Sequence, residues 1–136
     1  MNATSPETLS VVVERDIPFP PEKIWRALTQ PHLIEEWLMK NDFAPTVGHA
    51  FHFRAEWGSV DCEVEVVEPN KTLSYTWSAF GLKSVVTWTL TPAGGGTHLR
   101  MEQSGFRPDQ QPAYHGAQAG WQRFFAALER VVAKTD

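Results

Sequence analysis

The sequence has a single cysteine, Cys62, and no long run of apolar residues. One cysteine cannot form an intramolecular disulfide or a multi-cysteine metal site, and this scarcity is typical of a reducing compartment. The first residues, Met1 to Pro6, are polar, and no apolar segment long enough for a signal peptide or a membrane span follows them. These absences predict a cytoplasmic protein that does not insert into a membrane.

An excess of basic residues is also absent. The chain has 12 Lys and Arg against 16 Asp and Glu, which gives a formal net charge of −4. The two signs are interspersed, so there is no basic stripe of the kind that binds nucleic acid or an anionic membrane. A chain of 136 residues has the length of one domain and can bury roughly two thirds of its unfolded surface. We therefore expect residues 1–136 to form a single domain with neither of these partners.

The longest periodic pattern runs from Gln110 to Lys134 and predicts a helix. Its apolar residues recur at steps of three and four, so they share one face. Asp109 precedes it, where a carboxylate can accept hydrogen bonds from the free amides of the first turn. Gly116 and Gly120 lie inside the helix, where each costs about 1 kcal/mol relative to alanine. They either leave room beside the sheet or permit close packing or a slight bend.

The rest of the chain predicts one strand, two short helices and five further strands. Residues 9–17 form the first strand, Pro21 and Pro31 each open a short helix, and residues 39–48 form a loop at a pocket mouth. From His49 onward the apolar period changes to two, as in strands linked by hairpins. The predicted turns are Gly58–Ser59, Glu68–Asn70, Phe80–Leu82 and Pro92–Gly96. This order is α+β, with the apolar face of an antiparallel sheet covered by the final helix.

Aromatic residues gather on the inward faces of these elements. Trp57, for example, falls two residues beyond Ala55 in the alternation that Phe51 and Phe53 begin. We predict that the set lines a cavity and binds a ligand, and the alternative for each member is that it only fills the core. The predicted ligand-binding residues are Trp37, Phe51, Phe53, Trp57, Tyr75, Trp77, Trp88, Met101, Gln103, Trp121 and Phe125. Tyr75 and Gln103 are the polar members, and each needs a partner, which is a ligand, a neighbour or an internal water.

No catalytic or metal-binding arrangement is recognisable. The five histidines include no pair at the spacing of a helical metal site. Glu63 and Glu65 share an outward strand face, as expected of solvated charges. Cys62 falls on an apolar strand face, where its thiol should be inert. The sequence therefore predicts no catalytic residue, no metal site and no cofactor, and it leaves open whether the protein is an enzyme.

In the order and spacing of several short motifs, the chain resembles the activator of heat-shock protein 90 ATPase homologue-like family of the START-like (polyketide cyclase/dehydrase and lipid transport) superfamily. The motifs are Pro20, Glu22, Ile24 and Trp25; Pro31 with Trp37; Gly48; Val66, Val67, Glu68 and Pro69 with Leu73 and Trp77; Val86 to Leu90; Thr97 with Leu99; and Gly120, Trp121 and Leu128. The resemblance runs nearly end to end. It implies a helix-grip fold, in which a curved antiparallel sheet of about six strands wraps the long C-terminal helix and leaves a cavity between them.

Three functions are compatible with this resemblance, because fold alone does not choose among them. The first is the binding of a small hydrophobic or aromatic molecule between the sheet and the final helix. The second is a cyclase-type enzyme acting on an aromatic or polyketide-like substrate. The third is an interaction protein, as a homodimer or a chaperone partner, that uses exposed apolar residues at Phe80, Leu82 and Phe106.

Overall fold

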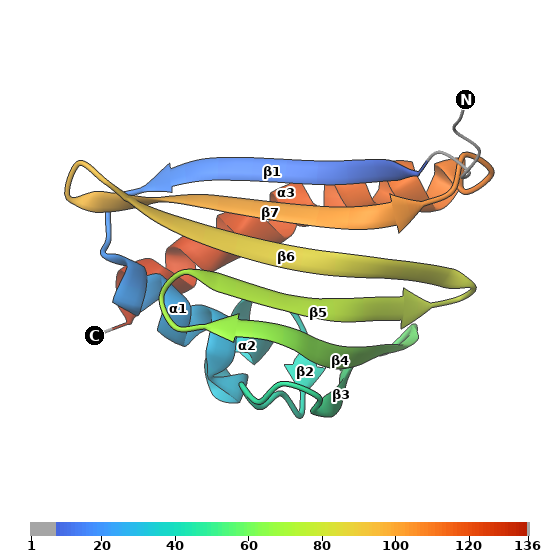
Figure 1. Cartoon of the computed structure of the whole chain (residues 1–136), viewed down its shortest axis with the longest axis horizontal. Coiled ribbons are helices and arrows are strands. Elements are labelled where there is room, and N and C mark those ends of the chain that lie inside the picture. The colour runs from blue at the N-terminus through green and yellow to red at the C-terminus, as the bar shows by residue number, and fades with distance from the viewer. Residues whose placement is uncertain (1–7, 136) are drawn as a thin grey trace.

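The computed structural model describes residues 8–135. Its centre is one antiparallel sheet with the strand order β1-β7-β6-β5-β4-β3-β2, which Figure 1 shows as a twisted layer in front of the long helix. The strands are β1 (Leu9–Ile17), β2 (Lys40–Asn41), β3 (Ala50–Ala55), β4 (Gly58–Glu68), β5 (Thr72–Ala79), β6 (Leu82–Ala93) and β7 (Gly96–Phe106). From β2 to β7 each strand pairs with the next in sequence, and β1 then pairs with β7 at the far edge.

Three helices cover one face of the sheet. They are α1 (Pro21–Thr29), α2 (Pro31–Trp37) and α3 (Gln111–Lys134). Pro21 and Pro31 each stand at the start of a helix, where a missing backbone N–H costs nothing. In Figure 1, α1 and α2 lie at the end of the sheet where α3 finishes, so the start of α3 is at the opposite end. The predicted α+β helix-grip fold is confirmed.

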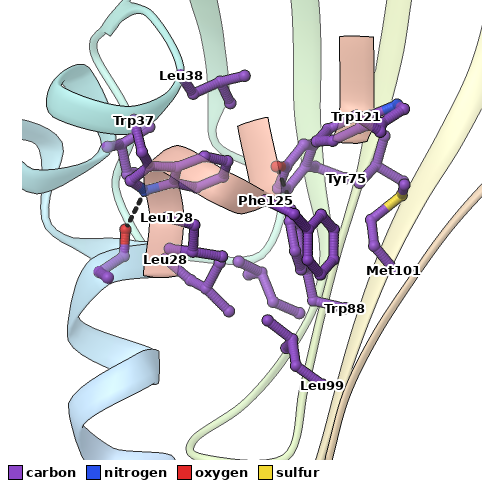
Figure 2. Packing of buried hydrophobic residues seen from close by; sticks show 14 of the residues in the cluster. Leu28, Trp37, Leu38, Tyr75, Trp88, Leu99, Met101, Trp121, Phe125 and Leu128 are labelled. Atoms are coloured by element: carbon purple, nitrogen blue, oxygen red, sulfur yellow. Dashed lines mark hydrogen bonds between the residues drawn. The ribbon is translucent and has the colours of Figure 1, made fainter. Parts of the chain in front are cut away.

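The core lies between the sheet and the second half of α3. Phe125 and Leu128 of that half are fully buried, and the ring of Phe125 lies 5.6 Å from that of Trp88 on β6. Figure 2 shows this packing, together with the hydrogen bond that Trp37 Nε1 donates to the carbonyl oxygen of Ala27 at 2.8 Å. Burial of several aromatic side chains, each worth roughly 1.5–3 kcal/mol, makes this the main source of stability.

Three details differ from the sequence expectations. The 39–48 segment contains the two-residue strand β2, so the sheet has seven strands rather than about six. The β3–β4 turn is at Glu56–Trp57, because Ala55 already pairs with Gly58, whereas we predicted Gly58–Ser59. Asp109 does not cap α3, since its carboxylate accepts a hydrogen bond from Arg107 Nε at 3.1 Å instead.

Within the described part of the chain, none of the helices is both long enough and apolar enough to cross a membrane.

Candidate ligand-binding site

A cavity of about 520 Å³ lies between the first half of α3 and the adjacent ends of β4 to β7. Its volume is within the range of small-molecule sites, about 300–1,000 Å³. The lining residues are Trp57, Val60, Trp77, Ala79, Phe80, Leu82, Gln103, Phe106, Gln110, Pro112, Ala113, Gly116, Ala117, Gly120, Trp121, Arg123 and Phe124. Because most of these side chains are apolar, the cavity favours an apolar occupant.

The cavity exists because the first half of α3 carries small side chains. The wall that α3 presents includes Ala113, Gly116, Ala117 and Gly120. The buried residues of α3 begin only at Trp121, so the helix packs tightly against the core from that residue onward. A Cβ atom placed on Gly116 would meet nothing within 4 Å, which shows open space beside the helix. Of the two explanations for these glycines, room beside the sheet is the one that fits Gly116.

Hydrogen bonds connect three residues of the cavity wall, Trp77, Gln103 and Trp121, in part through Ser84, which does not line the cavity. Trp121 Nε1 donates to Gln103 Oε1 at 2.7 Å, and Gln103 Nε2 donates to Ser84 Oγ at 3.0 Å. Ser84 Oγ in turn donates to the carbonyl oxygen of Trp77 at 2.9 Å. Gln103 is 2% exposed, so its neighbours satisfy the buried amide even without a ligand. The network fixes the orientation of the indole of Trp121, which also lies 5.5 Å from the ring of Trp77.

Two exposed aromatic rings from separate turns form the rim. Phe80, at the β5–β6 turn, is 81% exposed, and Trp57, at the β3–β4 turn, is 55% exposed. Their ring centroids are 5.8 Å apart. Phe80 has φ of 51°, a left-handed conformation that costs a residue with a side chain about 1–2 kcal/mol. The turn therefore keeps an aromatic residue where its backbone favours glycine or asparagine, a pattern that occurs at functional positions.

Glycine at position 105 places Phe106 in the cavity wall. Gly105 has φ of 111°, and a Cβ atom there would lie 2.8 Å from the carbonyl oxygen of Lys83. No other residue fits this approach of β7 to β6 without distortion. Phe106 follows it and is fully buried, with its ring 5.6 Å from that of Tyr114. Our expectation that Phe106 belongs to an exposed apolar surface is therefore wrong, and Leu82 is half-buried.

Four of the predicted ligand-binding residues line the cavity, namely Trp57, Trp77, Gln103 and Trp121. Trp57 does so from the turn, where it is exposed, and not from the inward strand face that we predicted. The other predicted residues are Trp37, Phe51, Phe53, Tyr75, Trp88, Met101 and Phe125, and all of them are buried in the hydrophobic core. Whether any of these residues contacts a ligand stays a prediction.

The loop of residues 39–48 explains why some of the predicted ligand-binding aromatic residues do not line the cavity. Phe43 of this loop is buried, and its ring lies 5.0 Å from Phe51 and 6.3 Å from Tyr75. The loop thus covers the sheet beside α2 and adds no residue to the cavity, contrary to our prediction that it sits at a pocket mouth.

Burial makes the two titratable groups of the core unreactive. Burial raises the pKa of the Tyr75 hydroxyl, although the hydrogen bond that this oxygen accepts from Trp88 Nε1 lowers it in part. Burial, followed by the charge of Asp61, likewise raises the pKa of the Cys62 thiol. Both groups therefore keep their protons at neutral pH, as expected of an inert thiol and a structural hydroxyl.

Sequence reasoning missed several residues that line the cavity, among them Val60, Phe80, Phe106, Arg123 and Phe124. The helical period contained a signal for Phe124, which falls on the inward face of α3. The paired glycines of α3 gave a second signal, because small residues in a long helix indicate where a neighbour or a ligand approaches. Arg123 had no such signal, since it falls on the face that the period assigns to solvent.

Comparison with known proteins gives a consistent result. The model of the family described as Activator of Hsp90 ATPase homolog 1-like protein matches residues 18–133. The crystal structure of protein MLL2253 from Mesorhizobium loti is 66% identical, with a TM-score of 0.91 over 94% of this chain and 99% of that one. DynU16, a protein in the dynemicin biosynthetic locus, is 30% identical with a TM-score of 0.81. That match covers 92% of this chain and 47% of DynU16, so this chain spans about half of DynU16.

A more distant structure shares the fold alone. The Aha1 dimer from Colwellia psychrerythraea is 22% identical, with a TM-score of 0.82 over 91% of this chain and 96% of that one. No curated protein matches the sequence.

Proposed function

This chain belongs to the family of Activator of Hsp90 ATPase homolog 1-like proteins, as the sequence resemblance predicted, and we propose that it binds a small aromatic molecule between its sheet and α3. The observation that carries the proposal is the cavity of about 520 Å³ beside the small residues of α3. Trp57, Trp77 and Trp121 supply flat apolar surfaces, and aromatic rings gain about 0.5–1.5 kcal/mol from stacking beyond the burial of their area.

Binding is a better proposal than acid–base catalysis because of the side chains that line the cavity. Among the described residues, Arg123 is the one charged side chain of the lining, which includes no Asp, Glu, His, Cys, Lys or Tyr. General acid–base catalysis needs a group whose pKa lies near the working pH. Tyr75, the one hydroxyl among the predicted ligand-binding residues, is buried in the core outside the cavity lining and keeps its proton.

The proposal also explains why α3 keeps features that weaken it. Gly116 and Gly120 cost the helix about 1 kcal/mol each relative to alanine. Close packing cannot explain Gly116, because nothing lies within 4 Å of its missing Cβ atom. A ligand that occupies this space explains both the glycine and the exposed rings at the rim.

The experiment is a titration with N-phenyl-1-naphthylamine, a neutral aromatic probe whose fluorescence rises in apolar surroundings. We expect saturable 1:1 binding by the wild-type protein and a loss of at least about 10-fold in affinity for Ala117→Trp, which fills the cavity from α3. Ala119→Trp is the matched control, because Ala119 is exposed on the same helix and does not line the cavity.

Bound probe should also raise the stability of the wild-type protein. At a free probe concentration of 100 times Kd the gain is about 2.7 kcal/mol, measured by urea denaturation with and without probe. Equal affinity of the Ala117→Trp and Ala119→Trp variants for the probe would show that the cavity is not the site.

A further inference from the structure

Arg123 lies at the edge of the cavity with its guanidinium over Gly120. Its Nη2 atom is 3.9 Å from the position that a Cβ atom on Gly120 would take, and Cε2 of Phe124 is at the same distance. One end of the guanidinium therefore lies beside Gly120 at the cavity wall, while the side chain as a whole is exposed to solvent. A glycine at position 120 leaves space on that side of the charge.

Among the residues that the structure describes, none provides a counter-charge to the guanidinium of Arg123. Arg100 is 2.9 Å from Glu102, and Arg107 is 3.1 Å from Asp109. Arg123, in contrast, makes no ion pair or hydrogen bond within residues 8–135. Its N–H groups are thus available, in the fork geometry that matches a carboxylate or a sulfonate.

The cavity lining also contains no acid among the described residues. Its polar groups are Arg123, Gln103, Gln110 and the indole N–H groups of tryptophan, although the chain as a whole carries a net charge of −4. A charge at the edge of an apolar wall acts more strongly than the same charge in open water, because less water screens it. The potential at this mouth therefore favours an anion.

We infer that the ligand of this cavity is an aromatic molecule with an acidic group, whose rings stack among Trp77 and Trp121 while Arg123 binds the anion at the mouth. This inference rests on the proposed binding function and adds the chemical class of the ligand. Trp121 and Phe124 flank Arg123 by two and one positions on α3 and lie 5.5 Å apart, so the aromatic surface and the charge meet at one place.

The test compares two probes that share one ring skeleton. 8-Anilinonaphthalene-1-sulfonate carries a sulfonate, and N-phenyl-1-naphthylamine is the same skeleton without it. The wild-type protein, Arg123→Gln and Arg130→Gln are each titrated with both probes at low and at moderate salt. Arg130→Gln is the matched control, since Arg130 is exposed on α3, lies outside the cavity lining and changes the net charge equally.

We expect Arg123→Gln to weaken binding of the sulfonate probe about 5- to 10-fold, as loss of a charge-assisted hydrogen bond at a partly exposed site requires. Its affinity for the neutral probe should change less than about twofold, and Arg130→Gln should resemble wild type with both probes. Salt should weaken only the sulfonate complex of proteins that keep Arg123.

Two other results would distinguish failure of the anion site from failure of the proposed binding function. If the neutral probe binds and Arg123→Gln affects both probes equally, the anion site is refuted and the proposed function stands. If neither probe binds wild-type protein saturably, the proposed function fails, and the inference fails with it.

Discussion

Substitutions of Gly116 test separately how a side chain at this position affects the stability of the fold and ligand binding in the cavity. Gly116 lies in α3 with ordinary helical geometry, is exposed, and has nothing within 4 Å of the position of a Cβ atom. Gly116→Ala therefore adds no clash, and the gain in helix propensity should raise the free energy of unfolding by about 1 kcal/mol. In a domain of 136 residues this corresponds to a rise of about 3–5 °C in Tm.

A larger side chain at the same position should have the opposite effect on binding. Gly116→Leu gains almost as much helix propensity as Gly116→Ala, but it places four side-chain carbon atoms at the cavity where glycine has none. We expect this variant to be at least as stable as the wild type and to bind N-phenyl-1-naphthylamine at least about 10-fold more weakly. Ala119→Leu adds a leucine on the exposed side of the same helix and should bind the probe normally.

Urea denaturation followed by far-UV circular dichroism measures the first effect, and probe titration measures the second. A fall in stability for Gly116→Ala would show that a neighbour occupies the space beside α3. Normal probe binding by Gly116→Leu would show that the ligand lies elsewhere. Either outcome would refute the argument that the fold tolerates a side chain at position 116 and the cavity does not.

Two further predictions concern other parts of the molecule. Phe80→Asn should raise the free energy of unfolding by about 1 kcal/mol, because asparagine adopts the left-handed conformation at φ of 51° more readily than phenylalanine. The affinity for N-phenyl-1-naphthylamine should fall, because the rim loses an aromatic ring. A lower stability of the variant in urea denaturation would contradict this prediction. In its protonated form His98 donates from Nδ1 to Asp16 and from Nε2 to Glu14. The hydrogen bond to Glu14, then that to Asp16, raises the pKa of His98 above its usual 6.5. Its contribution to stability is then complete below pH 6.5 and disappears as the pH rises through the raised pKa. The stability advantage of the wild type over His98→Gln should therefore shrink as the pH rises above 6.5, and a pH-independent difference in urea denaturation would refute the argument.

The sequence predicts the framework well because periodicity reports burial directly. The predicted first strand has the bounds of β1, and the predicted final helix begins one residue before α3. The two-residue period of apolar side chains alone misplaces Trp57. This alternation continues past Ala55, the last residue of β3 that pairs with β4, and so does not show where the strand pairing ends. The turn there depends on register with β4, which is a tertiary property.

The candidate site was harder to predict than the fold. Phe51 and Trp77 have the same pattern in sequence, yet Phe43 covers Phe51 in the structure while Trp77 faces the cavity. Which inward residue stays uncovered depends on where α3 and the 39–48 loop pack, and a strand pattern contains no information about that. Phe106 illustrates the reverse, because a residue expected at the surface is buried once Gly105 brings β7 close to β6.

The pairing of β1 with β7 has a consequence for the order in which the chain assembles. Strands β2 to β7 are joined by short connections, so each hairpin can form locally. Strand β1, in contrast, must wait for a partner about 80 residues away in the sequence. The hydrogen bond between Asp16 and His98, which are 82 positions apart, illustrates this separation. During synthesis β1 therefore leaves the ribosome first and remains without a partner until β7 has emerged. The charges of Glu14, Arg15 and Asp16 make it a poor template for other chains during that interval. Among the described strands, β1 is therefore synthesised first but can pair only after β7, the last strand, has been made.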